Sequence, residues 1–287
     1  MSFIQFARAH GVEIGDLIAS DRIRRCATVE KPRSKNGAYF WDGQRGWVFD
    51  WSGEAKTHWY DDPSAKPWTD EEKRSWSLKR QTMAADQERK HHNAALQAAI
   101  LLRSAVPGVH GYLVRKHLGD VQGLVLPDGA LLVPMRNLGS NDLQGAQVIR
   151  WLPDEMKWEK KMLPGMRAKG AVLRLGPKTA RETCLCEGYA TGLSIELAAR
   201  QGRLSMAVLV CFSDSNLVHV AGLLRDGAGR RIVFADNDKS EAGQHAAKES
   251  GLSYCMSDVV GEDANDVHAT RGLMAVTALL MKARSKS

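Results

Sequence analysis

The feature that most constrains the fold is a regular alternation of strand-like and helix-like segments that begins at Thr183 and continues toward the end of the chain. Short apolar runs of the length of buried strands alternate with longer segments in which apolar residues recur at helical spacing. The predicted strands are 183–186, 206–212, 231–235 and 253–260, and the predicted helices are 190–200, 217–225, 242–249 and a last one from about 265. This alternation predicts an α/β fold with a parallel sheet covered by helices.

Acidic residues directly follow two of these predicted strands. Glu187 ends the first strand, and Asp236 and Asp238 end the third. Ligands of open parallel sheets bind beyond the carboxyl ends of the strands, so the three carboxylates are expected at one edge of the sheet. Mg²⁺ takes carboxylate oxygens together with water and substrate phosphates, and such a site suits phosphoryl transfer.

Each acid also has a purely local explanation. Glu187 could stabilise the beginning of a helix through the helix dipole, and the Asp-Asn-Asp segment from Asp236 could form a turn. Their joint position on successive strand–helix units favours the metal site instead.

Positive charge is concentrated before these acids. The formal net charge is +7, and residues 150–181 contain nine Lys and Arg against three acids. A basic surface beside a metal site suits a nucleic-acid backbone and nucleotide phosphates, although lysine clusters also occur on surfaces that bind nothing.

Composition excludes several classes of protein. With 287 residues, of which 44% are hydrophobic, the chain can bury a core and has room for two ordinary domains. No apolar run approaches the roughly 18 residues of a membrane helix, and the N-terminus lacks the layout of a secretory signal. We therefore expect no membrane partner and a cytoplasmic location. The five cysteines are an odd number without framework spacing and predict no disulfide scaffold.

The sequence divides into four predicted parts. Residues 1–62 form a small β-rich unit with turn dipeptides at Asn36-Gly37 and Asp42-Gly43. A polar helical connector over 63–107 follows, with a helix-start signal at Thr69. The other two parts are a basic mixed α/β subdomain at 108–180 and the alternating series at 181–287.

The C-terminal half resembles the Toprim domain shared by bacterial-type primases, type IA and II topoisomerases and certain nucleases. The residues that carry the resemblance are Glu187-Gly188, the Asp-x-Asp at 236–238 and the acidic stretch at 261–267. Glu-Gly-Tyr-Ala-Thr-Gly-Leu-Ser from Glu187 is similar to primase-type proteins of bacteriophages and plasmids, as are the upstream segments at 111–116 and 131–136. The resemblance implies a Toprim parallel sheet with flanking helices, preceded by a basic subdomain.

The resemblance further implies a DNA primase, a nucleotidyltransferase that joins ribonucleoside triphosphates into short RNA primers on single-stranded DNA in a bacterial host cell. Glu187, Asp236 and Asp238 would be catalytic and would bind Mg²⁺ or Mn²⁺. Thr191 replaces a further acid common in the family, so Asp263 and Asp266 remain as additional metal candidates. The implied nucleic-acid or nucleotide contacts are Arg136, Arg150, Lys157, Lys160, Lys161, Arg167 and Lys169. No phosphate-binding loop of a helicase occurs, so a replicative helicase or polymerase would act in trans.

The N-terminal part resembles the zinc ribbon of bacterial primases with its ligands replaced. Cys26 stands at one ligand position, while Val29, Val48 and Trp51 stand at the others. A structural zinc needs four ligands, so we predict no zinc and an apolar plug in its place. The clustered aromatic residues of this unit could instead form a platform for stacking bases.

Two other functions stay open. A Toprim-type nuclease would use the same acids to cut DNA, whereas a non-catalytic accessory of replication would bind single-stranded DNA without turnover. Thr191 and the missing zinc ligands give the accessory some weight. A topoisomerase needs large gate domains, for which this chain has no room.

Overall fold

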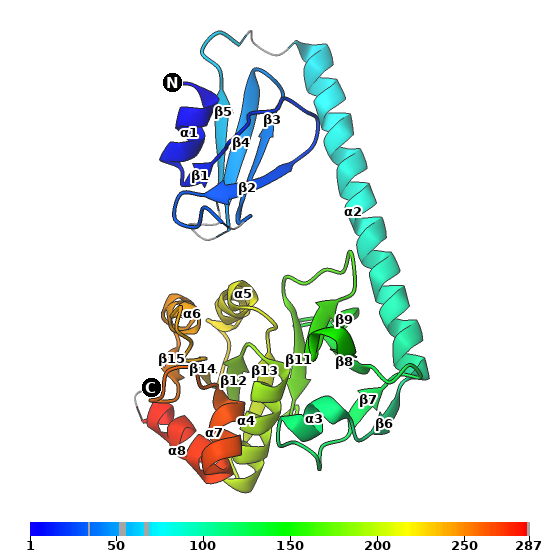
Figure 1. Ribbon diagram of the computed structural model, residues 1–287, viewed down its shortest axis with the longest axis vertical. Coiled ribbons are helices and arrows are strands. Elements are labelled where there is room, and N and C mark those ends of the chain that lie inside the picture. The colour runs from blue at the N-terminus through cyan, green and yellow to red at the C-terminus, as the bar shows by residue number, and fades with distance from the viewer. Residues whose placement is uncertain (34, 52–55, 66–68, 286–287) are drawn as a thin grey trace. The chain divides into compact units, whose positions relative to one another are not determined.

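The computed structural model describes residues 1–33, 35–51, 56–65 and 69–285. Contacts within the chain divide it into two units, Met1–Arg80 and Gln81–Ser287 (Figure 1). Neither unit contains, in its described residues, a helix that is long and apolar enough to cross a membrane. The four-part division predicted from the sequence stays a prediction.

The first unit is an antiparallel sheet in which each strand pairs with its neighbour in sequence, in the order β1-β2-β3-β4-β5. Ser2 and Gln5 form a capping box at the beginning of the helix α1. The elements are α1 (Phe3–Ala9), β1 (Val12–Glu13), β2 (Arg24–Thr28), β3 (Gly37–Trp41), β4 (Arg45–Asp50) and β5 (Thr57–Asp61). The predicted β-rich unit is confirmed.

Of the two predicted turn dipeptides, one is confirmed. The Asp42 carboxylate accepts hydrogen bonds from the N–H groups of Gln44 and Arg45 at 2.8 and 2.6 Å, and closes the turn between β3 and β4. The turn predicted at Asn36-Gly37 is wrong. Gly37 begins β3, where a Cβ atom would lie 2.6 Å from the carbonyl oxygen of Ala27, so close strand pairing requires the glycine.

The predicted apolar plug is only partly correct. Val48 is buried in the core beneath α1, but Val29 and Trp51 are 47% and 49% exposed. The Arg25 guanidinium lies 3.8 Å from the centroid of a Trp51 ring, a cation–π contact that occupies this side chain. Burial raises the pKa of Cys26 to about 11, which keeps the thiol protonated and disfavours it as a metal ligand.

The helix α2 (Asp70–Ser104) begins where the sequence predicts. Thr69 and Glu72 form a reciprocal cap, in which the Thr69 N–H donates to Glu72 at 2.7 Å and the Glu72 N–H donates to Thr69 at 3.2 Å. Its C-terminal part belongs to the second unit, where Ala94 and Ala98 are buried. Most other positions of α2 are exposed, as expected for a polar connector.

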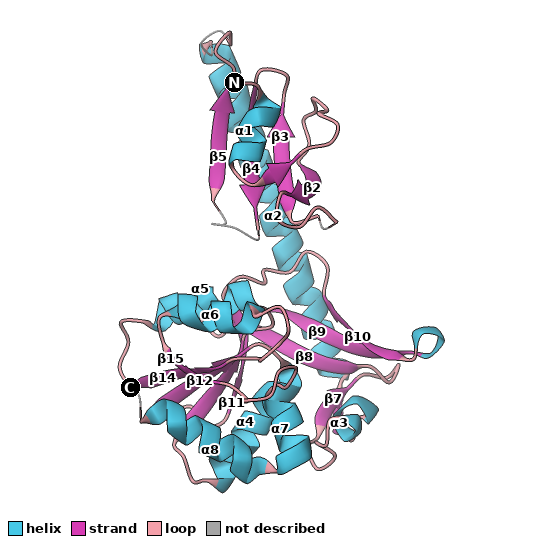
Figure 2. Ribbon diagram, turned by 60° about the vertical axis from the view of Figure 1, so that its left-hand side comes forward, coloured by secondary structure: helices cyan, strands magenta, loops and turns pink. Residues whose placement is uncertain are grey.

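The second unit is built on a ten-stranded sheet in the order β10-β9-β8-β11-β13-β12-β14-β15, with β7 joined to β8 and β6 to β7 (Figure 2). Its antiparallel half contains β6 (Val106–Gly108), β7 (Gly123–Val125), β8 (Leu131–Asn137), β9 (Leu143–Leu152), β10 (Lys157–Met162) and β11 (Ala171–Leu175). Its parallel half contains β12 (Glu182–Cys186), β13 (Met206–Val210), β14 (Arg230–Phe234) and β15 (Ser253–Cys255). The short helices α3 (Gly111–Arg115) and η1 (Pro153–Glu155) belong to the antiparallel half.

Helices cover both faces of the parallel half, with α5 and α6 on one face and α4, α7 and α8 on the other (Figure 2). Leu185, Leu209 and Val233 point to the first face, whereas Cys184 and Cys186 point to the second, as alternation along a strand requires. These helices are α4 (Tyr189–Gln201), α5 (Asp214–Leu224), α6 (Ala242–Ser250), α7 (Ala264–Arg271) and α8 (Leu273–Arg284). The predicted α/β class is confirmed.

Three predicted element bounds are wrong. The strand predicted to reach Phe212 ends at Val210, because Phe212 takes the left-handed conformation (φ +66°) and turns the chain into α5. The strand predicted at 253–260 ends at Cys255. The last predicted helix is divided into α7 and α8 by Gly272, whose φ is +77°.

Asn216 connects the two halves of the sheet to α5. It is buried, accepts a hydrogen bond from the Gly170 N–H at 2.7 Å, and donates to the carbonyl oxygens of Ala171 and Cys211, both at 2.8 Å. We expect Asn216→Ala to lower the free energy of unfolding by about 2–4 kcal/mol, because it leaves these buried backbone groups without their partner. Denaturant unfolding followed by circular dichroism measures the change.

Ser215→Ala is the matched control, since Ser215 is exposed in the same turn of α5. Its free energy of unfolding should stay within about 0.5 kcal/mol of the wild type. Equal stability of the two variants would contradict the role of Asn216.

Candidate functional site

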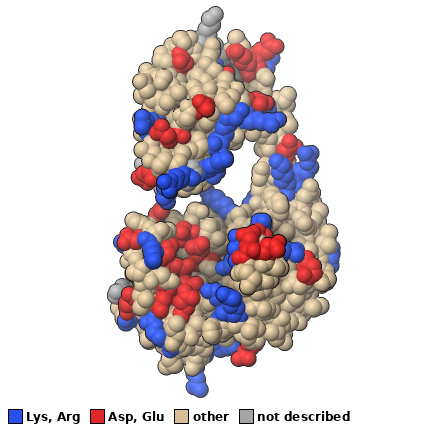
Figure 3. Space-filling model, viewed as in Figure 1, with Lys and Arg blue, Asp and Glu red and all other residues tan. Residues whose placement is uncertain are grey.

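Acids from neighbouring parallel strands gather at the carboxyl edge of the sheet. Glu187 follows β12, Asp214 begins α5 after β13, and Asp236 and Asp238 follow β14. β12 lies between β13 and β14, so Glu187 has acids on both sides. Acidic side chains accordingly gather over the parallel half in Figure 3, with Lys and Arg side chains beside them.

Burial, together with neighbouring carboxyl groups, holds the pKa values of Glu187, Asp214 and Asp236 above the usual range. Burial raises the pKa of Glu187 to about 7, with further contributions from the charge of Asp214 and a hydrogen bond to it. Burial, followed by the charges of Asp263 and Glu187, raises the pKa of Asp236 to about 8. Burial also raises the pKa of Asp214. The hydrogen bond from Glu187 lowers this pKa, but burial has the larger effect.

One buried oxygen of this group is unsatisfied. Asp236 Oδ1 is inaccessible to solvent and has no hydrogen-bond partner among the described residues. A carboxylate oxygen without a donor is costly to bury, and a cation beside it would remove that cost. In donor type and charge, Glu187, Asp236 and Asp238 thus fit a hard divalent cation.

The side chains do not converge on a common point as they stand. In the described part of the chain, no group of three or more His, Cys, Asp or Glu residues is close enough together to hold a metal ion. Coordination would therefore require rotation of the carboxylates toward a shared position.

The loop after β14 is held by its middle residue. Asn237 donates to the Ser257 carbonyl oxygen at 3.0 Å and accepts from Gln244 at 3.1 Å. Asp238 Oδ1 accepts from the Ala242 N–H at 3.2 Å and so fixes the beginning of α6. Gly243 allows α6 to approach closely, because a Cβ atom there would lie 2.4 Å from the Asp236 carbonyl oxygen.

Asp263 and Asp266 have clear structural partners at the beginning of α7. Asp263 Oδ1 accepts from the N–H groups of Asn265 and Asp266 at 2.7 and 2.9 Å, and Asp263 Oδ2 accepts from the Thr191 hydroxyl at 3.1 Å. Asp266 completes the capping box by accepting from the Asp263 N–H at 3.2 Å, and Lys116 Nζ lies 3.7 Å from its other oxygen. That Asp263 and Asp266 bind a metal ion stays a prediction.

Most of the basic residues implied by the resemblance have protein partners. Arg136 donates to the carbonyl oxygen of Asn141 at 3.0 Å. Four others form ion pairs, namely Arg150 with Asp128, Lys157 with Glu155, Lys161 with Glu159, and Arg167 with Glu88. Lys169 lies near His219, whose pKa is lowered by burial and by the Lys169 charge.

Lys160 is placed differently from its neighbours on β10. Its Nζ lies 5.3 Å from the centroid of the buried Tyr112 ring. Although burial raises the pKa of Glu187, the positive charge of Lys160 lowers it. β10 therefore brings one cation from the antiparallel half toward the acids of the parallel half.

Sequence reasoning missed Asp214. The predicted strand ran to Phe212 and the predicted helix began at Leu217, so Asp214 fell into the loop between them. In the structure, Ser213 caps α5 by accepting from the Asn216 N–H at 3.3 Å, and Asp214 is the first helical residue. An acid that follows an apolar run was the available signal, as it was for Glu187.

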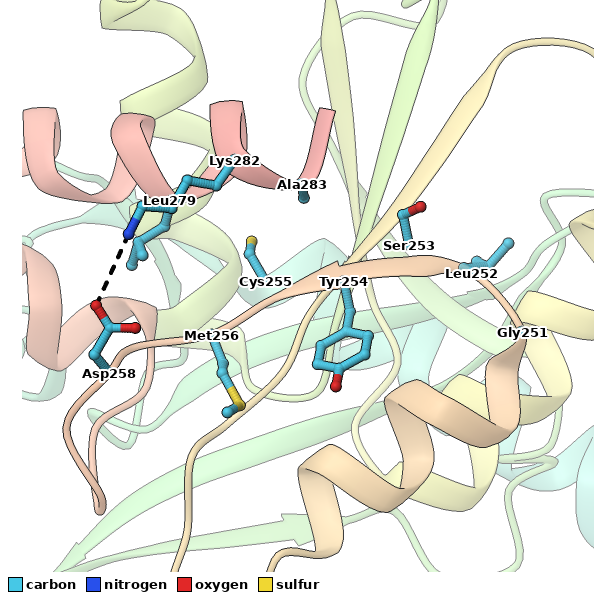
Figure 4. Close-up of a pocket in the computed structure, with 10 residues that line it drawn as sticks. All are labelled: Gly251, Leu252, Ser253, Tyr254, Cys255, Met256, Asp258, Leu279, Lys282 and Ala283. Carbon is cyan, nitrogen blue, oxygen red and sulfur yellow. Dashed lines mark ion pairs between the residues drawn. The ribbon is translucent and has the colours of Figure 1, made fainter. Parts of the chain in front are cut away.

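A separate cavity of about 530 Å³ lies beside β15 (Figure 4). Its walls are Gly251, Leu252, Ser253, Tyr254, Cys255, Met256, Asp258, Leu279, Lys282 and Ala283. At its rim, Lys282 Nζ lies 3.9 Å from Asp258 Oδ2. None of the acids at the carboxyl ends of β12, β13 and β14 is among these walls, so we assign the chemistry to the sheet edge instead.

Comparison with known families agrees with this geometry. Residues 182–273 match the family model of the Toprim domain, a range that includes β12 to β15 and the acids Glu187, Asp214, Asp236 and Asp238. This part of the chain is therefore a Toprim domain, as the resemblance of its motifs predicts.

Among solved structures, one similar chain comes from the bacteriophage T7 lagging-strand DNA polymerase interacting with primase domains of two gp4 subunits bound to an RNA/DNA hybrid and dTTP. The similarity covers 61% of this chain and 86% of that chain, with 15% identity and a TM-score of 0.39. A search of curated proteins found no match.

The raised pKa values predict how stability depends on pH. A carboxyl group whose pKa is raised by folding stabilises the fold below its unfolded pKa, near 4, and this contribution is lost as the pH rises through the folded value. Without divalent cations, Asp236→Asn should therefore raise the melting temperature at pH 8.5 by roughly 3 °C or more relative to the wild type. The difference should be smaller at pH 5.5. Thermal unfolding in EDTA at both pH values measures it.

Asp258→Asn is the matched control, since this side chain is 82% exposed and lies in a turn after β15. It should shift the melting temperature equally at both pH values. A similar pattern for Asp236→Asn would show that the charge of Asp236 is not constrained by its neighbours.

Proposed function

We propose that the protein is a DNA primase, a nucleotidyltransferase that makes short RNA primers on single-stranded DNA during phage or plasmid replication in the bacterial cytoplasm. The observation that carries the proposal is the position of Glu187, Asp236 and Asp238 at the carboxyl edge of a Toprim sheet. The charge of Lys160, on β10, acts on Glu187 from the antiparallel half. A helicase or polymerase would be supplied in trans.

Glu187, Asp236 and Asp238 would hold Mg²⁺ or Mn²⁺. When bound, the ion supplies charge neutralisation at the α-phosphate and the leaving pyrophosphate, and it lowers the cost of deprotonating the attacking 3′-hydroxyl. Glu187 and Asp236 release their protons as they bind a cation, because their pKa values of about 7 and about 8 keep them partly protonated at neutral pH. Cation binding should therefore strengthen as the pH rises.

Lys160 would orient the triphosphate beside these acids, since its ammonium group acts on Glu187 across the boundary between the two halves. The other basic residues would contact the DNA backbone. Arg150 and Lys161 can exchange their carboxylate partners for phosphates at little cost, because exposed ion pairs contribute only about 0–1 kcal/mol.

A second candidate is a non-catalytic accessory that binds single-stranded DNA. It is favoured by Thr191, which stands where the family commonly has an acid and donates its hydroxyl to Asp263. A Toprim-type nuclease would use the same acids, and the assay that tests for primer synthesis also distinguishes it.

Primer synthesis on single-stranded DNA, with labelled ribonucleotides and Mg²⁺ or Mn²⁺, tests the proposal. The wild type should make short labelled oligoribonucleotides, and Asp236→Ala should reduce their yield roughly 100-fold or more, because it removes a carboxylate ligand of the cation that neutralises the reacting phosphates. Cutting of the DNA without primers would make the protein a nuclease. Binding without either reaction would make it an accessory.

The role of Lys160 can be tested against its neighbour in sequence. Lys160→Ala should raise the KM for nucleotides at least tenfold, because it removes the positive charge that acts on Glu187. Lys161→Ala should change KM less than twofold, since Lys161 is paired with Glu159 on the surface. Steady-state kinetics with varied nucleotide concentration separates the two variants. Equal effects would mean that the lysines act only through overall charge.

A further inference from the structure

We propose that Asp214 is a further carboxylate ligand of the divalent cation held by Glu187. This inference rests on the metal site of the proposed function, but it does not depend on the reaction that the site performs. Asp214 lies outside every motif that the sequence analysis identified.

Strand pairing places Asp214 beside Glu187. β12 and β13 are parallel and in register up to Cys186 and Val210. The hydrogen bonding continues past the strands, as the Phe212 N–H donates to the Glu187 carbonyl oxygen at 2.9 Å. Asp214 follows two residues later, and its carboxyl group is hydrogen-bonded to that of Glu187. The two carboxyl groups therefore follow neighbouring parallel strands at the same edge of the sheet.

The backbone around Asp214 is firmly held. Phe212 is buried and takes a φ of +66°, a conformation that a bulky residue adopts only when its surroundings impose it. Asn216 anchors the first turn of α5 to Ala171 and Cys211, and Ser213 caps it. The positive end of the α5 dipole favours an ionised carboxylate at this position. These contacts fix Asp214 at the edge before any ligand binds.

Asp214 also has the free oxygens that Asp263 lacks. Both carboxylate oxygens of Asp263 already accept hydrogen bonds, from two N–H groups and from Thr191. For Asp214, the hydrogen bond with Glu187 is its one side-chain partner within the described residues. A cation bound between Glu187 and Asp214 would remove the repulsion between carboxylates at neighbouring strand ends.

Binding of Mn²⁺ to the full chain, measured by isothermal titration calorimetry at pH 7.5, tests the inference without a need for activity. Asp214→Asn keeps the size and the hydrogen-bonding capacity of the side chain but loses the anionic ligand. We expect its dissociation constant for Mn²⁺ to rise at least tenfold. Asp226→Asn is the matched control, an exposed acid just beyond the end of α5, and should stay within twofold. Wild-type affinity in Asp214→Asn would overturn the inference.

Thermal unfolding distinguishes a metal ligand at Asp214 from a residue that only stabilises α5. In EDTA, Asp214→Asn should melt no lower than the wild type, because it removes a charge beside Glu187, and it should lose most of the Mn²⁺-induced rise in melting temperature. A lower melting temperature in EDTA with an unchanged rise would mean that Asp214 only supports α5. Asp214→Glu, which restores a carboxylate, should bind Mn²⁺ more tightly than Asp214→Asn.

The two proposals fail in different ways. If the wild type makes no primers but its Mn²⁺ affinity still depends on Asp214, the proposed function is wrong and the inference stands. If primers are made and Asp214→Asn binds Mn²⁺ as the wild type does, the inference alone is wrong.

Discussion

Parallel pairing of β12 with β13 on one side and β14 on the other is the constraint on which the rest of the site depends. Parallel strands end at the same edge, so residues that follow them meet even when they are far apart in sequence. Packing on both faces of these strands keeps the ends together despite the repulsion between their carboxylates. The fold thus stabilises an arrangement that the acids alone would not adopt.

The acids at the strand ends could be predicted from the sequence where they come directly after an apolar run. Glu187 and Asp236 directly follow buried strands, and an acid in that position is visible in the sequence. Asp214 was not found, because Ser213 separates it from the apolar run and the left-handed turn at Phe212, which begins the approach to α5, leaves no periodic signal. Tertiary packing, rather than local preference, imposes that turn.

Position in a motif also failed to predict which way a side chain faces. Val48 and Trp51 both occupy ligand positions of the ribbon pattern, but Val48 points into the core while Trp51 lies just beyond the end of β4. In the basic stretch, alternation along β10 separates Lys160 from Lys161, a distinction that counting charges cannot make. The family resemblance located these segments, and the strand geometry places their side chains in different surroundings.

The short strand β11 determines how the two halves of the large sheet can move. Its first residues, Ala171 and Val172, pair with β8, whereas Leu173 to Leu175 pair with β13. Sliding one half past the other by a single residue would turn this strand's side chains to the opposite faces and expose its core. The two halves of this sheet therefore cannot slide past each other without breaking the pairing of β11. β10, which carries Lys160, and the strands that carry the carboxylates are thus held in a fixed register through β11.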